Sequence, residues 1–577
     1  MLRKEDYPPF PEGVLWLDYQ NLVQPLVEQA EQTPERVCLV VLNDRQEWEE
    51  IRCAELHAGA LAFATQLRQA GVAPNELVLL VLNHSRALFE AFLGALYAQA
   101  IPSVYPYLTP KMDLREAAQD IEELLDSAEI STLLTSHAVQ PFLARPGRRV
   151  LAVDEHAPAR LPADVEPLAV DWRAISPEQV AFVQFSSGTT GHKKGVAITH
   201  RQIILEMNSL SFGHQSTPAR TDVFVSWLPM HHDMGLIGNF LHPVASGLTA
   251  VIMSPFQWLR QPKLLYQAMH HYHGTLCYMP NFAFNYSVQG VRAADLAGLN
   301  LHSMRRLMNG AEPVRYDSIR LFVEKFGPYG LTADKIKPSY GMAENVLGIA
   351  SAPVGEMYYV EWIDRRRFQQ ENLAVLTSPE AEGAMPQVSS GKALWGTEVK
   401  ITDDAYTTLP DRQVGNILLR SPYLFNGYYH RPELSADLFI DGWFVTGDLG
   451  YMFDGHIFVT GRKKDLIIVG GKNIHPPDLE EIAQTVPGVY PGRVVVFGLE
   501  NSKIGSEEVV LVAELLPGVS AEQESQIMHE IRHRIVQHSE VALKDVRLVR
   551  ERWVIKTSSG KTARTANREQ YLAQFGR

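Results

Sequence analysis

Cysteine is scarce in this chain. Its 577 residues include three cysteines, Cys38, Cys53 and Cys277. Thiols this few and this scattered exclude a disulfide framework and a cysteine-ligated zinc site, and they suit a reducing compartment. We therefore expect a cytoplasmic protein.

Long uninterrupted apolar runs are also missing. The most apolar stretch, residues 87–107, is broken by Glu90 and Pro102. A membrane-spanning helix needs about 20 consecutive apolar residues, so this stretch predicts a buried helix and strand, and we expect no integral membrane segment. Residues 1–13 carry acidic residues and prolines without an apolar segment, which predicts that no signal peptide is present.

The chain has no basic excess. Its 53 Lys and Arg are outnumbered by 66 Asp and Glu, which gives a formal charge of −13. This balance argues against nucleic acid or an anionic membrane as the main partner. The length exceeds what one hydrophobic core usually supports, so at least two domains are expected.

Strand-like and helix-like segments alternate in the first part of the chain. They comprise strands at 37–42, 77–82, 131–135 and 149–153, a helix at 54–69, and a helix with Leu88, Phe92 and Leu96 on one face. Such alternation is typical of crossover units and predicts an α/β fold with a largely parallel sheet.

Residues 184–196 form a loop rich in Ser, Thr and Gly. A strand-like run at 180–185 precedes it, and a helix-like run begins near Thr199. Glycines let backbone N–H groups turn inward, hydroxyls add donors and Lys194 adds a positive charge, a combination that can hold phosphate. The loop is not a Walker motif, because Gly195 follows Lys194. The alternative is a flexible surface turn.

Residues 227–238 place polar side chains between a strand and an apolar helix. His232 could face a substrate, whereas the simpler interpretation is that Asp233 caps the helix. A metal site is a further alternative, because histidines gather in this region. They are His231, His232, His270, His271 and His273. Their spacing fits no ligand motif and no cysteine supports them.

An aromatic segment at 278–284 contains Phe282 and Phe284. It could form one wall of an apolar acyl tunnel, although such aromatics are more often plain core.

Several strings, taken in order, resemble the core motifs of the adenylate-forming superfamily, which contains acyl-CoA synthetases, peptide-synthetase adenylation domains, luciferases and fatty acyl-AMP ligases. The strings are 186–194, 232–235, 309–313, 339–344, 443–448, 461–465 and 556–561. The His-Asp-Met-Gly string and Ala343 look most like the fatty acyl-AMP ligases, since many acyl-CoA synthetases have Thr at the position of Ala343. One departure is Lys193, which stands where the superfamily usually has Pro.

The resemblance implies ATP and Mg²⁺ as cofactors and assigns roles to individual residues. Lys561, Glu344 and His232 would be catalytic, Glu344 would also hold the magnesium, and Lys464 would be the hinge. The implied nucleotide-binding residues are Ser186, Ser187, Gly188, Thr189, Thr190, Gly191, Lys194, Asn309, Gly310, Ala311, Glu312, Ser339, Tyr340, Gly341, Met342, Ala343, Asp448 and Arg462.

The resemblance also implies a domain plan. Residues 1–463 would form a large adenylation domain with several subdomains and mixed sheets, and residues 464–577 a small mobile α+β lid that carries Lys561. Residues 354–391 resemble the insertion that separates acyl-AMP ligases from acyl-CoA synthetases. Its Arg365–Arg367 triplet could serve in docking a carrier protein.

The implied activity is activation of a medium- or long-chain fatty acid to an acyl-adenylate, with release of pyrophosphate. The acyl group would then pass to the phosphopantetheine of a separate acyl carrier protein, because no carrier domain is recognisable in the sequence. One alternative is an acyl-CoA synthetase. Another is a non-catalytic nucleotide-binding regulator, against which the presence of both Glu344 and Lys561 speaks.

Overall fold

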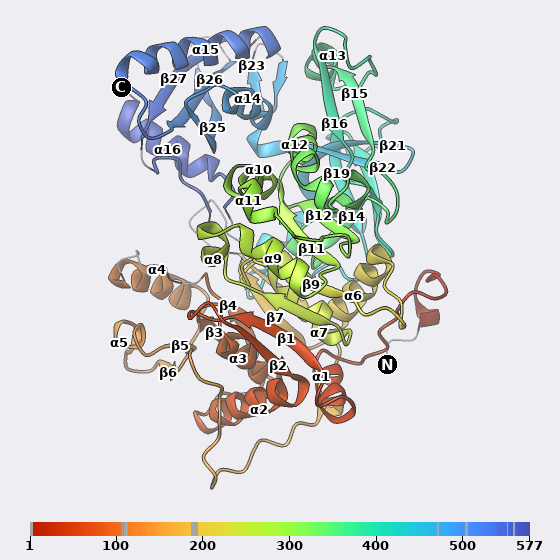
Figure 1. The fold of residues 1–577 in the computed structure, drawn as a ribbon, viewed down its shortest axis with the longest axis vertical. Coiled ribbons are helices and arrows are strands. Elements are labelled where there is room, and N and C mark those ends of the chain that lie inside the picture. Colours follow the sequence, from red (N-terminus) through yellow and green to blue (C-terminus); the bar gives the residue numbers. More distant parts are fainter. Residues whose placement is uncertain are drawn as a thin grey trace.

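The computed structural model describes residues 4–106, 108, 114–185, 194–469, 472–501, 506–539, 541–550, 552–557 and 560–576. Figure 1 shows the earliest part of the chain at the bottom and the C-terminal block, residues 466–576, at the upper left. The predicted phosphate-loop residues Ser186, Ser187, Gly188, Thr189, Thr190 and Gly191 lie outside the described residues.

One large mixed sheet runs through the body of the protein. In spatial order its strands are β18 (Glu398–Thr402), β19 (Gly415–Arg420), β21 (Trp443–Phe453), β22 (His456–Arg462), β17 (Lys392–Ala393), β14 (Gly348–Ser351), β13 (Ile336–Gly341), β12 (Arg306–Gly310), β11 (Leu276–Pro280), β9 (Val223–Ser226), β10 (Thr249–Ile252), β1 (Val37–Leu42) and β2 (Trp48–Arg52), with β20 (Phe439–Ile440) beside β21.

The prediction of a largely parallel sheet holds for only part of this sheet. The neighbours from β1 to β13 are parallel, and the pairs from β13 to β18 are antiparallel. The change occurs because a short turn joins β13 to β14, and a parallel pair needs a crossover of a dozen residues or more.

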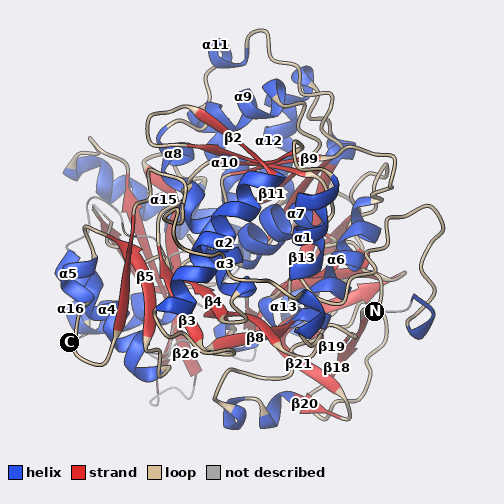
Figure 2. Cartoon of the chain, turned by 90° about the horizontal axis from the view of Figure 1, so that it is seen from below, coloured by secondary structure: helices blue, strands red, loops and turns tan. Residues whose placement is uncertain are grey.

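A second sheet is parallel throughout, in the order β4 (Ile101–Val104), β3 (Leu77–Val81), β5 (Thr132–Ser136), β6 (Arg149–Val153). Figure 2 shows α2 (Cys53–Gln69) and α3 (Arg86–Tyr97) between this sheet and the large one. Helix α3 is buried along its length, and its Phe89 ring lies 4.6 Å from Phe240. This burial accounts for the apolar stretch 87–107, and within the described residues no helix could cross a membrane.

Twelve α-helices lie before the 354–391 segment within the described residues. They are α1 (Val23–Gln32), α2 (Cys53–Gln69), α3 (Arg86–Tyr97), α4 (Leu114–Ser127), α5 (Gln140–Leu143), α6 (His200–His214), α7 (His242–Ala245), α8 (Pro255–Arg260), α9 (Lys263–His271), α10 (Asn281–Gly290), α11 (Ala293–Leu296) and α12 (Tyr316–Phe326). The predicted helix near Thr199 is α6, whose N-cap Thr199 accepts a hydrogen bond from Gln202 N.

The segment 354–391 folds into β15 (Val360–Asp364), α13 (Arg365–Glu371) and β16 (Ala384–Val388), with the two strands antiparallel. Ile363 and Phe368 are buried in one cluster with Tyr451 and Phe458 of β21 and β22. The segment is therefore part of the packed structure.

The C-terminal block has a hydrophobic core of its own, which includes Ile467, Leu479, Val496, Leu511 and Ile531. Its elements are β23 (Ile467–Val469), β24 (Lys472–Ile474), α14 (Pro476–Gln484), β25 (Val489–Asn501), β26 (Ser506–Leu515), α15 (Ala521–Ser539), β27 (Leu543–Val549) and α16 (Arg564–Phe575). The predicted hinge residue Lys464 lies in a single 3₁₀ turn, η9 (Lys463–Asp465), just before this core. The division of the chain at 463/464 and the mobility of the block stay predictions.

Candidate active site

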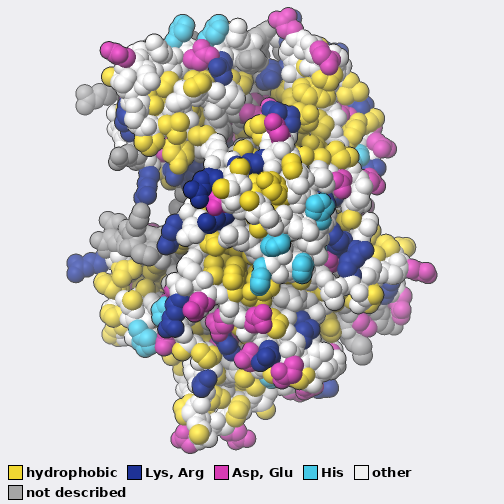
Figure 3. Space-filling view, viewed as in Figure 1, with side chains coloured by type: hydrophobic (Ala, Val, Ile, Leu, Met, Phe, Trp, Pro, Cys, Tyr) yellow, Lys and Arg dark blue, Asp and Glu magenta, His cyan; other side chains and the backbone are white. Residues whose placement is uncertain are grey.

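A cavity of about 2570 Å³ opens between the body and the C-terminal block. Figure 3 shows the surface hollowed at the left between these two parts, with Lys and Arg side chains along the margin. The predicted site residues that border the cavity are Lys194, His232, Ala311, Glu312, Ser339, Tyr340, Gly341, Met342, Ala343, Glu344, Asp448, Arg462, Lys464 and Lys561.

The loop that was predicted to hold phosphate closes a hairpin. Strand β7 (Val180–Phe185) ends where the loop begins, and β8 (Gly195–Thr199) follows it, with Phe185 paired to Gly195 in antiparallel register. Strand β8 was not predicted, because the helix was expected to follow the loop directly, although the β-branched Val196 and Ile198 are a signal for a strand.

Asp448 lies at the centre of a polar group on one wall. It sits on β21 directly opposite Arg462 of β22, and Arg462 Nε lies 3.3 Å from Asp448 Oδ1. The hydroxyl of Tyr340, from the end of β13, donates to Asp448 Oδ2 at 2.6 Å. Burial raises the pKa of the Asp448 carboxyl, although Arg462 and Tyr340 act in the opposite direction. The structure thus brings together three residues predicted from strings far apart in the chain.

Glu344 has a partner that the sequence analysis missed. The Tyr428 hydroxyl donates to Glu344 Oε1 at 2.9 Å, and Lys194 Nζ lies 4.8 Å from the centre of the Tyr428 ring. Tyr428 therefore links the predicted metal carboxylate to the lysine of the phosphate loop. No sequence signal marked this single tyrosine outside the motifs.

In the turn at the end of β12, two residues border the cavity and others are buried in the interior. Ala311 has a positive φ of 67° and borders the cavity together with Glu312, whose carboxylate accepts from Phe282 N. Asn309 is fully buried, and its Nδ2 donates to Asn281 Oδ1 at 3.2 Å. Asn309 and Gly310 are not among the residues that border the cavity, whereas Ala311 and Glu312 are. The assignment of this turn to adenine stays a prediction.

His232 and Asp233 form a close pair at the start of η3 (Met234–Leu241). His232 Nδ1 lies 2.6 Å from Asp233 Oδ1, which also accepts from Met234 N at 2.7 Å. The capping role of Asp233 is thus present beside a cavity-facing His232. Gly235 is required here by close approach, because a Cβ would stand 2.1 Å from the carbonyl oxygen of Pro229.

Lys561 is the predicted catalytic residue that reaches the cavity from the C-terminal block. Its loop is closed by a bridge between Lys556 and Thr562, and Lys561 N donates to Thr557 Oγ1 at 3.2 Å. Ser558 and Ser559 of this motif lie outside the described residues. Burial lowers the pKa of Lys561, and the nearby carboxylates of Asp233, Glu312 and Asp448 oppose that shift. The ammonium therefore lies within the field of three acids from the body.

The two aromatic residues that were predicted to line the acyl tunnel lie in different environments. Phe282 borders the cavity, and a Cβ on Gly560 of the lysine loop would lie 3.5 Å from its ring. Phe284 is fully buried, with its ring 4.8 Å from that of Phe322. The prediction is wrong for Phe284 because α10 turns that position toward α12, and plain core was the correct interpretation there.

The Arg365–Arg367 triplet is divided between an interface and the surface. Arg365 lies at the interface with the C-terminal block, within the field of Asp478 and Glu481. Arg367 pairs with Glu371 one helical turn away, at 2.6 Å, and both Arg366 and Arg367 are exposed. The carrier-docking role of the triplet stays a prediction.

The family profile of AMP-binding enzymes matches residues 26–429, which is most of the chain, and the protein belongs to this family. A putative acyl-CoA synthetase of Caulobacter vibrioides is 30% identical over 91% of this chain and 91% of its own length. A long-chain-fatty-acid–AMP ligase of Mycolicibacterium smegmatis is 31% identical over 91% of this chain and 89% of its own. A medium-chain-fatty-acid–[acyl-carrier-protein] ligase of Moorena producens is 29% identical over 92% and 91%.

Among solved structures, one from a study of fatty acyl-adenylate ligases of E. coli and L. pneumophila superimposes with a TM-score of 0.86. It is 28% identical in sequence and covers 98% of this chain and 100% of its own. The shared fold extends over the C-terminal block as well as the body, so the α/β architecture with a small C-terminal part is confirmed.

Proposed function

We propose that the protein converts a medium- or long-chain fatty acid and ATP into an acyl-adenylate and pyrophosphate. The observation that carries this proposal is the convergence of Lys561 from the C-terminal block with Asp448, Arg462 and Tyr340 of the body on one cavity. The similarity to ligases that act on fatty acids supports the choice of substrate.

In the proposed reaction one oxygen of the fatty acid carboxylate attacks the α-phosphorus of ATP. The bond from that phosphorus to the bridging oxygen breaks, and pyrophosphate leaves with the electron pair. The protein positions the two reactants and stabilises charge. Lys561 would bridge the carboxylate and the α-phosphate, Asp448 would accept from the ribose hydroxyls beside Arg462, and Tyr340 would stack on adenine.

Magnesium fits this site as an ion shared with the nucleotide. Among the described residues no group of three His, Cys, Asp or Glu side chains could hold a metal ion. Mg²⁺ in nucleotide sites typically takes one or two protein carboxylates and completes its shell with phosphate and water oxygens. Glu344 offers one such carboxylate beside Lys194 and Tyr428. When bound there, the ion would neutralise phosphate charge.

The proposed acceptor is the phosphopantetheine thiol of a separate acyl carrier protein. The thiol attacks the acyl carbonyl carbon, the bond from that carbon to the phosphate oxygen breaks, and AMP leaves. The similarity to a ligase named for an acyl carrier protein supports this choice.

The 354–391 segment gives a physical reason to favour this acceptor over coenzyme A. Asn473 Nδ2 of the C-terminal block donates to Asn372 Oδ1 at 2.9 Å, and the rings of Phe368 and His475 lie 5.7 Å apart. These contacts stabilise the block in its present position. A block held in this way resists the rotation that two-step relatives use to admit a thiol. Acyl transfer should therefore need an acceptor that also binds the protein surface, as a carrier protein would and free coenzyme A would not.

The test is incubation with ATP, Mg²⁺ and fatty acids of graded length, with acyl-adenylate, acyl-CoA and acylated carrier protein quantified side by side. Acyl-adenylate should form first, and acyl transfer to a carrier should exceed transfer to coenzyme A. Acyl-CoA formed as fast as ATP is consumed would establish the synthetase alternative, which the similarity to the Caulobacter protein favours. ATP binding without any acid-dependent pyrophosphate exchange would establish the regulator alternative.

A further inference from the structure

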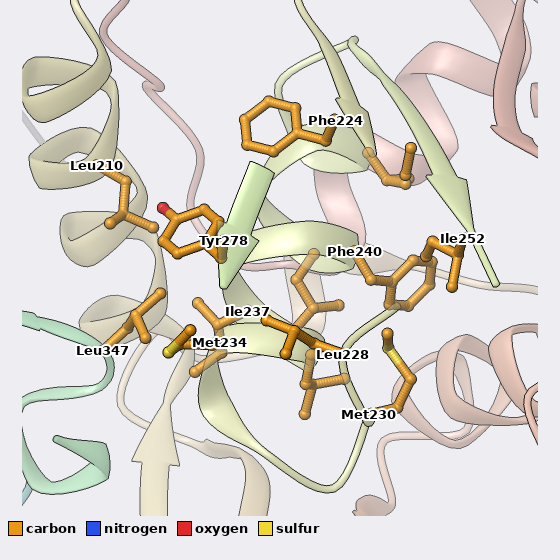
Figure 4. Close-up of a cluster of buried hydrophobic side chains, with 14 of the residues drawn as sticks. Leu210, Phe224, Leu228, Met230, Met234, Ile237, Phe240, Ile252, Tyr278 and Leu347 are labelled. Carbon is orange, nitrogen blue, oxygen red and sulfur yellow. The ribbon is translucent and has the colours of Figure 1, made fainter. Parts of the chain in front are cut away.

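One part of the cavity, called the arm below, is lined by side chains of the core. Its lining includes Met234 of η3, Tyr278 of β11 and Leu347. Figure 4 shows Leu210 and Tyr278 approaching each other above Met234 and Leu347. A walled apolar channel of this kind suits the methylene chain of the acid.

The lining of this arm includes a cation. Arg306 of β12 borders the cavity, although only 1% of its surface is exposed to solvent. Its Nη2 donates to Ser351 Oγ at 2.5 Å and to Ala352 O at 3.3 Å, whereas Nε and Nη1 have no hydrogen-bond partner. Within the described part of the chain no ion pair joins Arg306 to a carboxylate.

Neighbouring charges do not compensate Arg306. The adjacent Arg305 is already paired, with its Nη2 2.6 Å from Asp222 Oδ2. Lys337 is a second buried cation in the same region, and burial together with Arg306 lowers its pKa to about 8. Burial is also the main cause that lowers the pKa of Arg306 itself, to about 10.

A buried acid, Glu206, also lies near this arm, but it does not neutralise the charge of Arg306. Glu206 Oε1 accepts from Gly348 N at 2.7 Å and forms no ion pair with Arg306. Burial raises the pKa of Glu206 well above its usual value, which favours the uncharged acid. An unpaired guanidinium in a dry interior is costly, and such sites normally hold a counter-ion.

Two further features leave room for a polar group beside Arg306. Position 213 is glycine, and a Cβ there would lie 3.8 Å from Arg306 Nη1 and 2.9 Å from Leu394 Cδ2. His214 shares a 2.9 Å hydrogen bond with the Tyr278 hydroxyl through Nε2, and its Nδ1 has no partner. When Tyr278 is the donor, the His214 proton is on Nδ1, which then provides another donor in this arm.

We infer that the acyl substrate carries a second carboxylate at its far end, which forms a charge-assisted hydrogen bond with Arg306 while the near carboxylate reacts beside Lys561. The inference deepens the proposed function and rests on it. It makes Arg306 a specificity-determining residue and assigns the site to α,ω-dicarboxylic acids.

The test compares acyl-adenylate formation from three acids of equal length, ended by a carboxylate, a hydroxyl or a methyl group, over a series of lengths. The wild-type protein should prefer the dicarboxylic acid over the methyl-terminated acid at least tenfold in kcat/KM. Arg306→Met, which keeps volume and removes charge, should reverse that order. Arg305→Met serves as a control for loss of an arginine outside the cavity.

A binding measurement tests the same inference in case the Arg306→Met variant folds poorly. The dicarboxylic acid should raise the melting temperature of the wild-type protein more than the methyl-terminated acid does, and this difference should vanish in Arg306→Gln, which keeps a polar group and removes the charge. Equal or greater activity with the methyl-terminated or hydroxyl-terminated acid in the wild type would overturn the inference and leave the proposed function standing. Failure of every acid to support pyrophosphate exchange would overturn both.

Discussion

Arg315 of the body joins the C-terminal block through Asp478, with Arg315 Nη1 3.1 Å from Asp478 Oδ1. The same nitrogen lies 2.9 Å from Glu481 Oε2. Both acids belong to α14, and all three side chains are at least partly shielded from water. The pairing therefore stabilises the position in which Lys561 faces the cavity.

Substitution Arg315→Ala should weaken the docking of the C-terminal block. We expect adenylate formation to fall about tenfold, which corresponds to ~1.4 kcal/mol of lost stabilisation, and cleavage by protease near residues 463–466 to become faster. Arg320→Ala is the matched control, because Arg320 lies on α12, which directly follows Arg315, and its ion pairs among the described residues are with exposed acids of that helix. Unchanged rates of adenylation and cleavage would contradict this role.

Substitution Lys561→Ala should cut adenylate formation by roughly 10²–10³ while ATP binding stays nearly intact. Loss of a charged donor whose interaction forms mainly in the transition state typically lowers the rate by about this factor. Rapid-quench measurement of acyl-adenylate gives the rate, and Lys544→Ala, which removes an exposed lysine of the same block, provides the control. A variant with the wild-type rate would refute the catalytic assignment.

Substitution Asp448→Ala should act on binding, because bonds to the ribose exist before and during the reaction. We expect the apparent KM for ATP to rise with a smaller change in kcat. Tyr340→Phe distinguishes the contribution of Tyr340 to Asp448 from that of Arg462, since it removes only the 2.6 Å hydrogen bond. A fall in kcat alone would show that Asp448 does not hold the ribose.

Substitution Asn372→Gly should allow some acyl-CoA formation while adenylation continues. Asn372 has a φ of 53°, which glycine adopts without strain, so the variant removes little more than the 2.9 Å contact with Asn473. Asn473→Ala tests the same contact from the other side. Removal of residues 356–384 is a poorer test, because it takes Ile363 and Phe368 out of the core. If both point variants transfer no acyl group to coenzyme A, the contact does not determine the acceptor.

Stability should fall on mild acidification. Burial lowers the pKa of His84 to about 4 and that of His200 and His242 to about 3. Below their ordinary pKa of ~6.5 these histidines bind protons in the unfolded chain but stay neutral in the folded chain. Their contribution to the free energy of unfolding is therefore fully present above that pH and declines as the pH falls toward 4. Linkage gives up to about 2 kcal/mol for each group at pH 5.

Urea unfolding at pH 7.5 and pH 5 measures this difference. His242→Asn should reduce the pH dependence, whereas His529→Gln at an exposed position should not. A midpoint that is equal at both pH values in the wild type would contradict the prediction.

Much of the element order could be predicted because it depends on local patterns. The strands at 37–42 and 149–153 were predicted with the bounds that β1 and β6 have, and the helix at 54–69 differs from α2 by one residue. Strand β2 was missed, because its sequence carries Glu49, Glu50 and Arg52 and only Ile51 is fully buried. The antiparallel half of the large sheet depends on which strands meet in space, which no local pattern determines.

The site was predictable as far as it consists of contiguous strings. Asp448, Arg462 and Tyr340 were assigned one by one, but their contacts follow from the register of β21 and β22 and from the end of β13. Tyr428 and Arg306 stand alone in the sequence. Their importance comes from burial and from partners distant along the chain, and these are visible only in the structure.

The close approach of the Gly560 loop to the ring of Phe282, where an added Cβ would lie 3.5 Å away, bears on the timing of turnover. The C-terminal block forms part of the cavity wall. If the block is the mobile lid that the sequence predicts, ATP and the acid should enter before it closes, and products should leave after it opens. The rate of repeated cycles would then depend on how fast a whole folded block moves through solvent. Added sucrose or glycerol should slow steady-state turnover as viscosity rises, while a single round of adenylation from the assembled complex proceeds at an unchanged rate.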